Sequence, residues 1–151
     1  MRWFGMIVAL VVICSLLIAP ITLNAASEEQ GDAILGKWLT AGGKSLVEIY
    51  KCGDGYCGKI VWLKEPFDKE GKEKLDVHNT DESKRNRKLL GLQIINGFKH
   101  KGDNRWEGGK IYDPEKGKTY KCKARLEGDN LKLRGYIGFS LIGRTTTWRR
   151  K

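Results

Sequence analysis

The densest group of polar side chains lies in a long charged segment near the middle of the chain. This group comprises Asp76, His78, Asn79, Asp81 and Glu82. Catalytic groups are often found in long loops on rigid strands, so these residues could take part in catalysis or bind a metal ion. Their oxygens could bind calcium, although the spacing lacks the EF-hand pattern and its terminal Glu. We favour the structural alternative, in which short polar side chains bond to the backbone and hold the loop.

Recognisable catalytic motifs are absent from the sequence. The chain has no Gly-x-Ser-x-Gly, no His-Glu-x-x-His and no phosphate-binding loop. We therefore predict that the protein is not an enzyme and uses neither a cofactor nor a metal ion. The net charge of +10 would attract polyanions, but Lys and Arg are spread over all outward strand faces. The sequence thus predicts no nucleic-acid partner.

Two of the cysteines flank a tight turn. Cys52 and Cys57 bracket Gly-Asp-Gly, which places both at the base of a hairpin. Cross-strand neighbours there have Cβ atoms close enough for a disulfide. The alternatives are two free thiols or a metal site, but His78 and His100 lie far away in the sequence. We predict a Cys52–Cys57 disulfide, and we expect Cys122 to be a buried free thiol.

Alternating apolar and charged residues indicate the elements that position these groups. Between residues 119 and 127, every second residue is apolar or small and the others are mostly charged. This period of two predicts a strand with one face on a core and one in water. A turn at 128–130 and a second alternating run predict an antiparallel hairpin. We predict eight strands, at 36–41, 45–52, 57–64, 89–99, 105–112, 118–127, 130–137 and 140–150.

Most of these strands are joined by short connections, and the exception is the long loop at residues 65–88. Antiparallel strands with one buried face can remove their edges by closing into a barrel, although a two-sheet sandwich fits the same pattern. We predict the barrel, an all-β, eight-stranded antiparallel up-and-down fold. Residues 30–35 are expected to form a short helical turn that plugs one end.

An eight-stranded barrel is wide enough to be filled by side chains or to hold one small ligand. Both alternatives remain open, and the function that we predict is non-catalytic binding of a small hydrophobic ligand. Arg134 or Tyr136 near the rim would meet a carboxylate on that ligand. The alternative is an envelope protein partner or a hydrolase-inhibitor role, with Tyr56 or Trp106 as exposed anchors. The candidate lumen and rim residues are Trp62, Tyr112, Tyr120, Leu126, Leu133, Arg134 and Tyr136.

The beginning of the chain predicts export. Arg2 precedes an uncharged apolar run from Phe4 to Leu23, and small residues follow. This is the layout of a signal peptide, so we assign residues 1–26 to the signal and 27–151 to a single barrel domain. The run is also long enough to span a bilayer, and an uncleaved anchor is the alternative. We predict a periplasmic or secreted protein that contacts a membrane only through an uncleaved signal segment.

The first and last predicted strands carry residues typical of lipocalin-like barrels. The first contains Gly36-Lys37-Trp38, and the last contains Arg144 and Arg149. The chain therefore resembles the lipocalin superfamily. That resemblance implies that Arg144 or Arg149 packs across the Trp38 ring and closes the barrel.

Ordered matches along most of the chain resemble a family of small exported bacterial proteins, domain of unknown function 2147. They lie at 36–38, 57–63, 76–79, 90–92, 106–114, 117–120, 131–136 and 143–149. The resemblance implies a periplasmic or secreted, lipocalin-like β-barrel, and it implies no activity.

Overall fold

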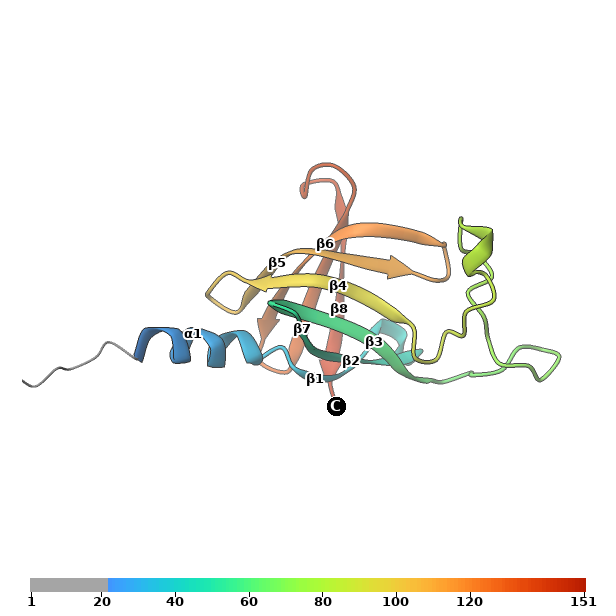
Figure 1. Cartoon of the computed structure of the whole chain (residues 1–151), viewed down its shortest axis with the longest axis horizontal. Coiled ribbons are helices and arrows are strands. Elements are labelled where there is room, and N and C mark those ends of the chain that lie inside the picture. Colours follow the sequence, from blue (N-terminus) through green and yellow to red (C-terminus); the bar gives the residue numbers. More distant parts are fainter. Residues whose placement is uncertain (1–21) are drawn as a thin grey trace, which may run out of the picture.

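Alternating apolar and polar residues let each strand turn one face to a shared core. In the computed structural model, which describes residues 22–151, eight antiparallel strands follow one another in chain order around a closed barrel (Figure 1). The last strand pairs with the first, so the sheet closes on itself. The predicted up-and-down barrel is confirmed, and the sandwich alternative is wrong.

One helix precedes the strands, and two short 3-10 helices lie in the connections. The elements are α1 (Thr22–Asp32), β1 (Gly36–Leu39), η1 (Ala41–Gly43), β2 (Ser45–Cys52), β3 (Gly55–Leu63), η2 (Glu82–Lys84), β4 (Gln93–His100), β5 (Arg105–Asp113), β6 (Lys118–Glu127), β7 (Asn130–Tyr136) and β8 (Gly143–Arg150). Of the predicted signal segment, residues 1–21 lie outside the described residues and residues 22–26 belong to α1. Within residues 22–151, no helix has the length and apolar character needed to cross a membrane.

The hairpin of β2 and β3 carries the disulfide. Gly53 in its turn has a positive φ of 58°, which glycine adopts without strain. The turn is therefore tighter than predicted, and β3 begins at Gly55. Cys52 and Cys57 are bonded as predicted, with Cα atoms 5.7 Å apart. They lie diagonally across the hairpin, because Cys57 is in register with Tyr50.

Two strands begin later than predicted, because loop contacts hold the residues before them. The amide of Leu89 donates to a carbonyl of the long loop, and β4 begins at Gln93. The guanidinium of Arg134 binds the carbonyl of Ser140, and β8 begins at Gly143.

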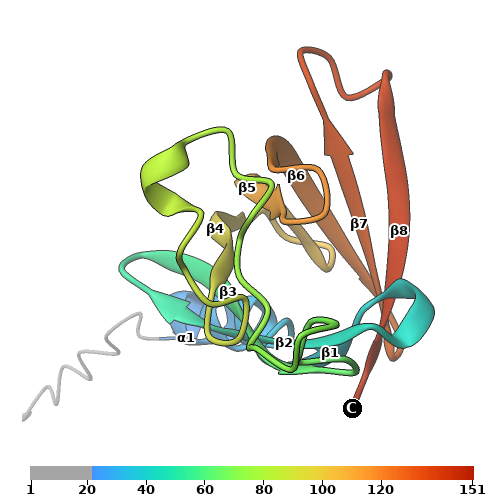
Figure 2. The same ribbon diagram turned by 90° about the vertical axis from the view of Figure 1, so that its right-hand side faces the viewer.

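The two ends of the barrel carry different structures. We call the end that carries α1 the closed end; it also carries the turns at 53–54, 101–104 and 128–129. We call the other the open end. It carries η1, the long loop at 64–92, the β5–β6 turn at 114–117 and the β7–β8 loop at 137–142 (Figure 2).

Large side chains fill the barrel next to the closed end. Trp38, Trp106 and Phe98 are fully buried. A side chain at Gly109 would overlap the ring of Phe98, so glycine makes room for that ring. Cys122 is a buried free thiol as predicted, and burial raises its pKa to about 12. In this part of the barrel the lumen is therefore occupied by the protein's own core.

The last turn of α1 and the residues that follow it plug the closed end, as the sequence predicted. The indole of Trp106 donates to the carbonyl of Gly31 at 3.1 Å, and that of Trp38 donates to Ile34 at 2.9 Å. The hydroxyl of Tyr56 donates to the Asp32 carboxylate at 2.9 Å. Tyr56 and Trp106 are buried, so the alternative in which they are exposed anchors for a protein partner is wrong.

The arginine that closes the barrel is Arg150. Its guanidinium lies 4.2 Å from the centre of the Trp38 ring and donates to the carbonyls of Ala33 and Leu35 at 2.6 and 2.9 Å. The prediction of Arg144 or Arg149 is wrong. Side chains alternate along a strand, so Arg150 shares the inward face of buried Trp148 and Arg149 points outward. Arg144 lies at the opposite end of β8.

Candidate functional site

The long loop at the open end is organised around Asp76. This carboxylate is fully buried and accepts hydrogen bonds from Tyr112 at 2.5 Å, Arg87 at 2.7 Å and Asn79 at 2.8 Å. Tyr112 belongs to β5, so the bond from its hydroxyl ties the loop to the barrel wall. These contacts give Asp76 and Asn79 the structural role that we favoured for the polar cluster. Tyr112, which we predicted at the lumen or rim, uses its hydroxyl to bind Asp76 instead of a ligand.

Hydrogen bonding sets the protonation of this network. Burial raises the pKa of Asp76, but hydrogen bonds from Tyr112, Arg87 and Asn79 outweigh it, so the pKa lies below its ordinary value. Burial and the bond to Asp76 raise the pKa of Tyr112 to about 12. Near neutral pH the carboxylate is ionised and the phenol is protonated. The pair therefore forms a stable hydrogen bond and is poorly placed to exchange a proton with a substrate.

The remaining members of the polar cluster do not converge on Asp76. His78 and Glu82 are exposed. Asp81 caps η2, because its carboxylate accepts bonds from the amide and the hydroxyl of Ser83 at 3.1 and 2.6 Å. Among residues 22–151, no group of three His, Cys, Asp or Glu side chains is placed to hold a metal ion.

Two hollows lie beside the long loop, and the larger is polar. It encloses about 510 Å³ between residues 79–87 and the ends of β4, β5 and β6. Its walls come from Asn79, Thr80, Asp81, Lys84, Arg87, Gln93, Tyr112, Gly117, Lys118, Thr119 and Ile137. Arg87 and Lys84 are already paired with Asp76 and Asp81. Among the described residues in its lining, Ile137 is the only aliphatic side chain, so this hollow offers little apolar surface to an apolar ligand.

The smaller hollow is apolar and lies beside Trp62. The pairing of β2 with β3 shifts between Leu46 and Val47, where Val47 is opposite Ile60 and Leu46 is opposite Trp62. The extra residue, Val61, turns Trp62 to the outer face, where it is 43% exposed. The prediction that Trp62 faces the lumen is therefore wrong.

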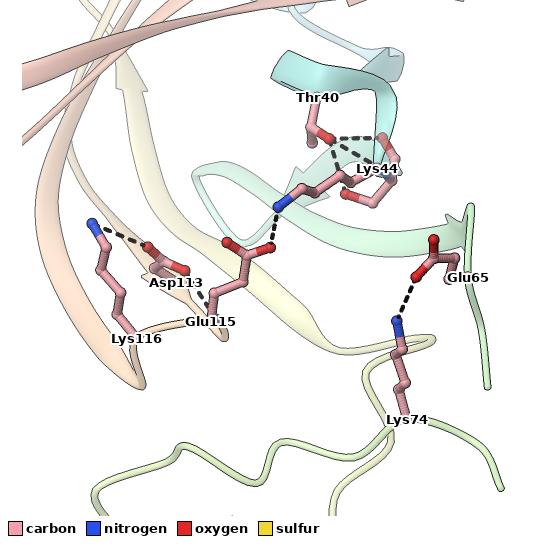
Figure 3. Close-up of polar contacts among 8 residues, drawn as sticks. Thr40, Lys44, Glu65, Lys74, Asp113, Glu115 and Lys116 are labelled. Carbon is pink, nitrogen blue, oxygen red and sulfur yellow. Dashed lines mark hydrogen bonds and ion pairs between the residues drawn. The ribbon is translucent and has the colours of Figure 1, made fainter. Parts of the chain in front are cut away.

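This Trp62 hollow has a volume of about 310 Å³. Two exposed apolar side chains from the loop, Phe67 and Leu90, stand beside Trp62. Lys74 and Lys88 lie at the edge and pair with the exposed carboxylates of Glu65 and Glu73; Figure 3 shows the Lys74–Glu65 pair. The lining residues are Val61, Trp62, Leu63, Pro66, Phe67, Glu73, Lys74, Lys88 and Leu90. An apolar floor with cations at its edge suits an apolar molecule that carries an acidic group.

An exposed ion pair spans the open end of the barrel. Lys44, which follows η1, lies 2.6 Å from Glu115 in the β5–β6 turn (Figure 3). The β1–β2 and β5–β6 connections are on opposite sides of the barrel, because they are four strands apart in its order. Both side chains are largely exposed to water, so the pair contributes little stability.

The other predicted lumen and rim residues are dispersed. Leu133 belongs to the packed core and Leu126 packs against it. Tyr120 is half-buried, in register with Ile111 of β5. Tyr136 pairs with Lys121, on the outer face of the barrel.

Arg134, which we predicted to meet a ligand carboxylate at the rim, is bonded to the β7–β8 loop and to β8. Its guanidinium donates to the carbonyls of Ser140 and Leu141 at 2.6 and 3.0 Å and to the Thr145 hydroxyl at 3.0 Å. These three bonds fix the β7–β8 loop and use three of the five N–H donors of the guanidinium.

Sequence reasoning missed the apolar residues in the loops. Phe67 and Leu90 flank the Trp62 hollow, and four more apolar residues occupy the β7–β8 loop. The available signal was the presence of large apolar residues outside any alternating run, because such residues lack a place on the core face of a strand.

Comparisons with known proteins agree with this fold. None of the curated proteins matches the chain. Among solved structures it is similar to protein HP1028 of the human pathogen Helicobacter pylori, which is described as belonging to the lipocalin family. The two are 25% identical with a TM-score of 0.66, over 78% of this chain and 82% of that one. The model of the family "Uncharacterized protein conserved in bacteria (DUF2147)" matches residues 36–150, so the chain belongs to the DUF2147 family.

Proposed function

We propose that this protein is an exported carrier that binds a small apolar molecule with an acidic group in the Trp62 hollow. The observation that carries the proposal is the exposure of Trp62, Phe67 and Leu90, which are 43%, 55% and 44% exposed around one preformed hollow. Exposed aromatic and aliphatic side chains that line one concave site are typical of ligand pockets. The lumen is a weaker candidate, because core side chains fill it near the closed end.

The edge of the hollow supports an acidic group on the ligand. Lys74 and Lys88 each contact an exposed glutamate, and such surface pairs are weak. A ligand carboxylate or sulfonate could therefore replace a glutamate at little cost. The proposal that the chain is exported rests on its N-terminal apolar run and on the Cys52–Cys57 disulfide, which persists in oxidising compartments.

The test uses 8-anilinonaphthalene-1-sulfonate, an apolar fluorescent probe that carries one sulfonate. Trp62→Ala should weaken binding by at least about tenfold, because the indole provides the largest apolar surface in the hollow. Phe139→Ala is the matched control, since it removes an exposed aromatic ring from a different loop. Unchanged affinity in Trp62→Ala would refute the site. If Tyr120→Ala weakened binding instead, the ligand would occupy the lumen.

A further inference from the structure

The β7–β8 loop keeps four large apolar side chains in water. Ile137, Phe139, Leu141 and Ile142 are 69%, 80%, 90% and 76% exposed. The loop projects away from the rest of the barrel at the open end (Figures 1 and 2). Isolated exposed apolar residues are common, but four within six consecutive positions form a patch that water solvates poorly.

The loop backbone is held in place while these side chains point outward. Arg134 binds the carbonyls of Ser140 and Leu141, and Lys123 donates to the Ser140 hydroxyl at 3.3 Å. The amide of Ile142 also bonds to the carbonyl of Phe139 at 3.1 Å. The backbone is therefore anchored to β6 and β7, and the exposure of the apolar side chains is built into the fold.

Positive charge is concentrated on the strands that carry this loop. Residues 118–151 contain ten basic and two acidic residues, a net charge of +8 out of +10 for the whole chain. These residues form β6, β7 and β8, which are neighbours in the barrel. The two acidic residues, Glu127 and Asp129, lie at the closed end. The net positive charge is thus concentrated on three neighbouring strands, although Lys and Arg occur along the whole barrel.

Cations surround the base of the loop without acidic partners. On the outer face, Lys121 lies opposite Tyr136, and Lys123 lies opposite Arg134. Arg144 follows the loop at the start of β8. Within residues 22–151, none of Lys121, Lys123, Arg134 and Arg144 forms an ion pair with a carboxylate.

We propose that the β7–β8 loop inserts into the surface of an anionic phospholipid bilayer while the surrounding cations contact its headgroups. A rigid apolar tip with a basic base is complementary to such a surface, where acyl chains lie beneath a layer of phosphates. A second copy of the chain fits less well, because it would bring the same cations together. The sequence had predicted membrane contact only through the N-terminal segment, and this proposal adds a second, independent contact.

The test places a fluorescent NBD label on the full chain at Leu141→Cys. The matched control carries the label at Asp129→Cys, which lies at the other end of β7 and whose native side chain is similarly exposed at 88%. Both proteins contain the N-terminal segment, which leads into α1 at the same end of the barrel as residue 129, so membrane binding through that segment alone would not raise the emission at 141. Vesicles of phosphatidylcholine with about 30 mol % phosphatidylglycerol should raise and blue-shift the emission at 141 and leave that at 129 unchanged.

Two further double variants distinguish the contribution of the apolar loop residues to vesicle binding from that of the surrounding cations. Phe139→Ser with Ile142→Ser should abolish the emission change at 141, because the apolar anchor is lost. Lys121→Gln with Arg144→Gln should weaken vesicle affinity by about 30-fold, as should replacing the lipid mixture with pure phosphatidylcholine.

Three results would overturn the proposal. They are equal responses from labels 129 and 141, an equal response to neutral and anionic vesicles, and an absent response at 141. A concentration-dependent dimer in sedimentation, together with an absent vesicle response, would show instead that a second copy covers the loop.

Discussion

At the closed end of the barrel, buried or half-buried side chains of β1, β5 and β8 donate hydrogen bonds to the carbonyls of Gly31, Ala33, Ile34 and Leu35. At the open end, Asp76 and Arg134 hold loops whose apolar side chains remain in water. The large side chains at the closed end are thus packed in the core, and those in the loops of the open end are exposed to water. Burial of apolar surface stabilises the first arrangement, whereas the second requires another reason for its persistence, such as a ligand or a membrane.

The largest expected effect on stability concerns one tryptophan from each end of the barrel. Trp38→Ala should lower the free energy of unfolding by about 3–5 kcal/mol, because it removes a fully buried ring. Trp62→Ala should lower it by less than about 1 kcal/mol, because that side chain is 43% exposed. Urea denaturation followed by circular dichroism measures both. Similar losses in the two variants would contradict the division between the ends.

The next effect tests the network that orders the long loop. Asp76→Asn should lower the free energy of unfolding by about 2–3 kcal/mol, because Arg87 loses its buried carboxylate partner while remaining partly hydrated. Asp129→Asn, at an exposed position, should change it by less than about 0.5 kcal/mol. Unfolding in urea gives both values.

The Asp76 network also predicts a pH dependence. The folded pKa of Asp76 lies below its ordinary value of 3.8, so its contribution is present above that pH and is lost as the pH falls through the lowered folded value. The stability difference between wild type and Asp76→Asn should therefore shrink in this acidic range. If the difference stayed constant down to complete unfolding, the carboxylate would not be the stabilising group.

A smaller effect distinguishes neighbouring arginines on β8. Arg150→Ala should cost about 1–2 kcal/mol, because it removes two hydrogen bonds to the plug and a contact with the Trp38 ring. Arg149→Ala, on the outer face, should cost less than about 0.5 kcal/mol. Thermal denaturation of the pair would reveal the difference, and a reversed order would mean that Arg149 closes the barrel.

The smallest effect on global stability concerns the β7–β8 loop. Arg134→Lys keeps the charge but cannot reproduce the forked set of bonds to Ser140, Leu141 and Thr145. We expect a loss of less than about 1 kcal/mol in the free energy of unfolding, with faster hydrogen exchange at residues 138–142. Lys132→Arg, on the same strand and face, serves as the control. Unchanged exchange in Arg134→Lys would show that the loop does not depend on this side chain.

Much of the fold could be predicted because its signals are local. The alternating run around Cys122 indicates a strand, and the Gly-Asp-Gly between Cys52 and Cys57 indicates a disulfide hairpin. The candidate site was predicted less well. Trp62 changes face because of one extra residue in β3, and the order of amino acids does not reveal where pairing shifts.

By itself, the sequence determined most of the strands, their antiparallel order and the disulfide, because each depends on neighbours along the chain. It favoured a barrel over a sandwich, but closure joins the first strand to the last. Only the tertiary structure decided that Arg150 covers Trp38, that Asp76 binds Tyr112, and that Arg134 holds the loop. These contacts join residues whose meeting depends on strand register and loop path. A change of one residue in register turns a side chain to the other face, so local patterns cannot specify such partners.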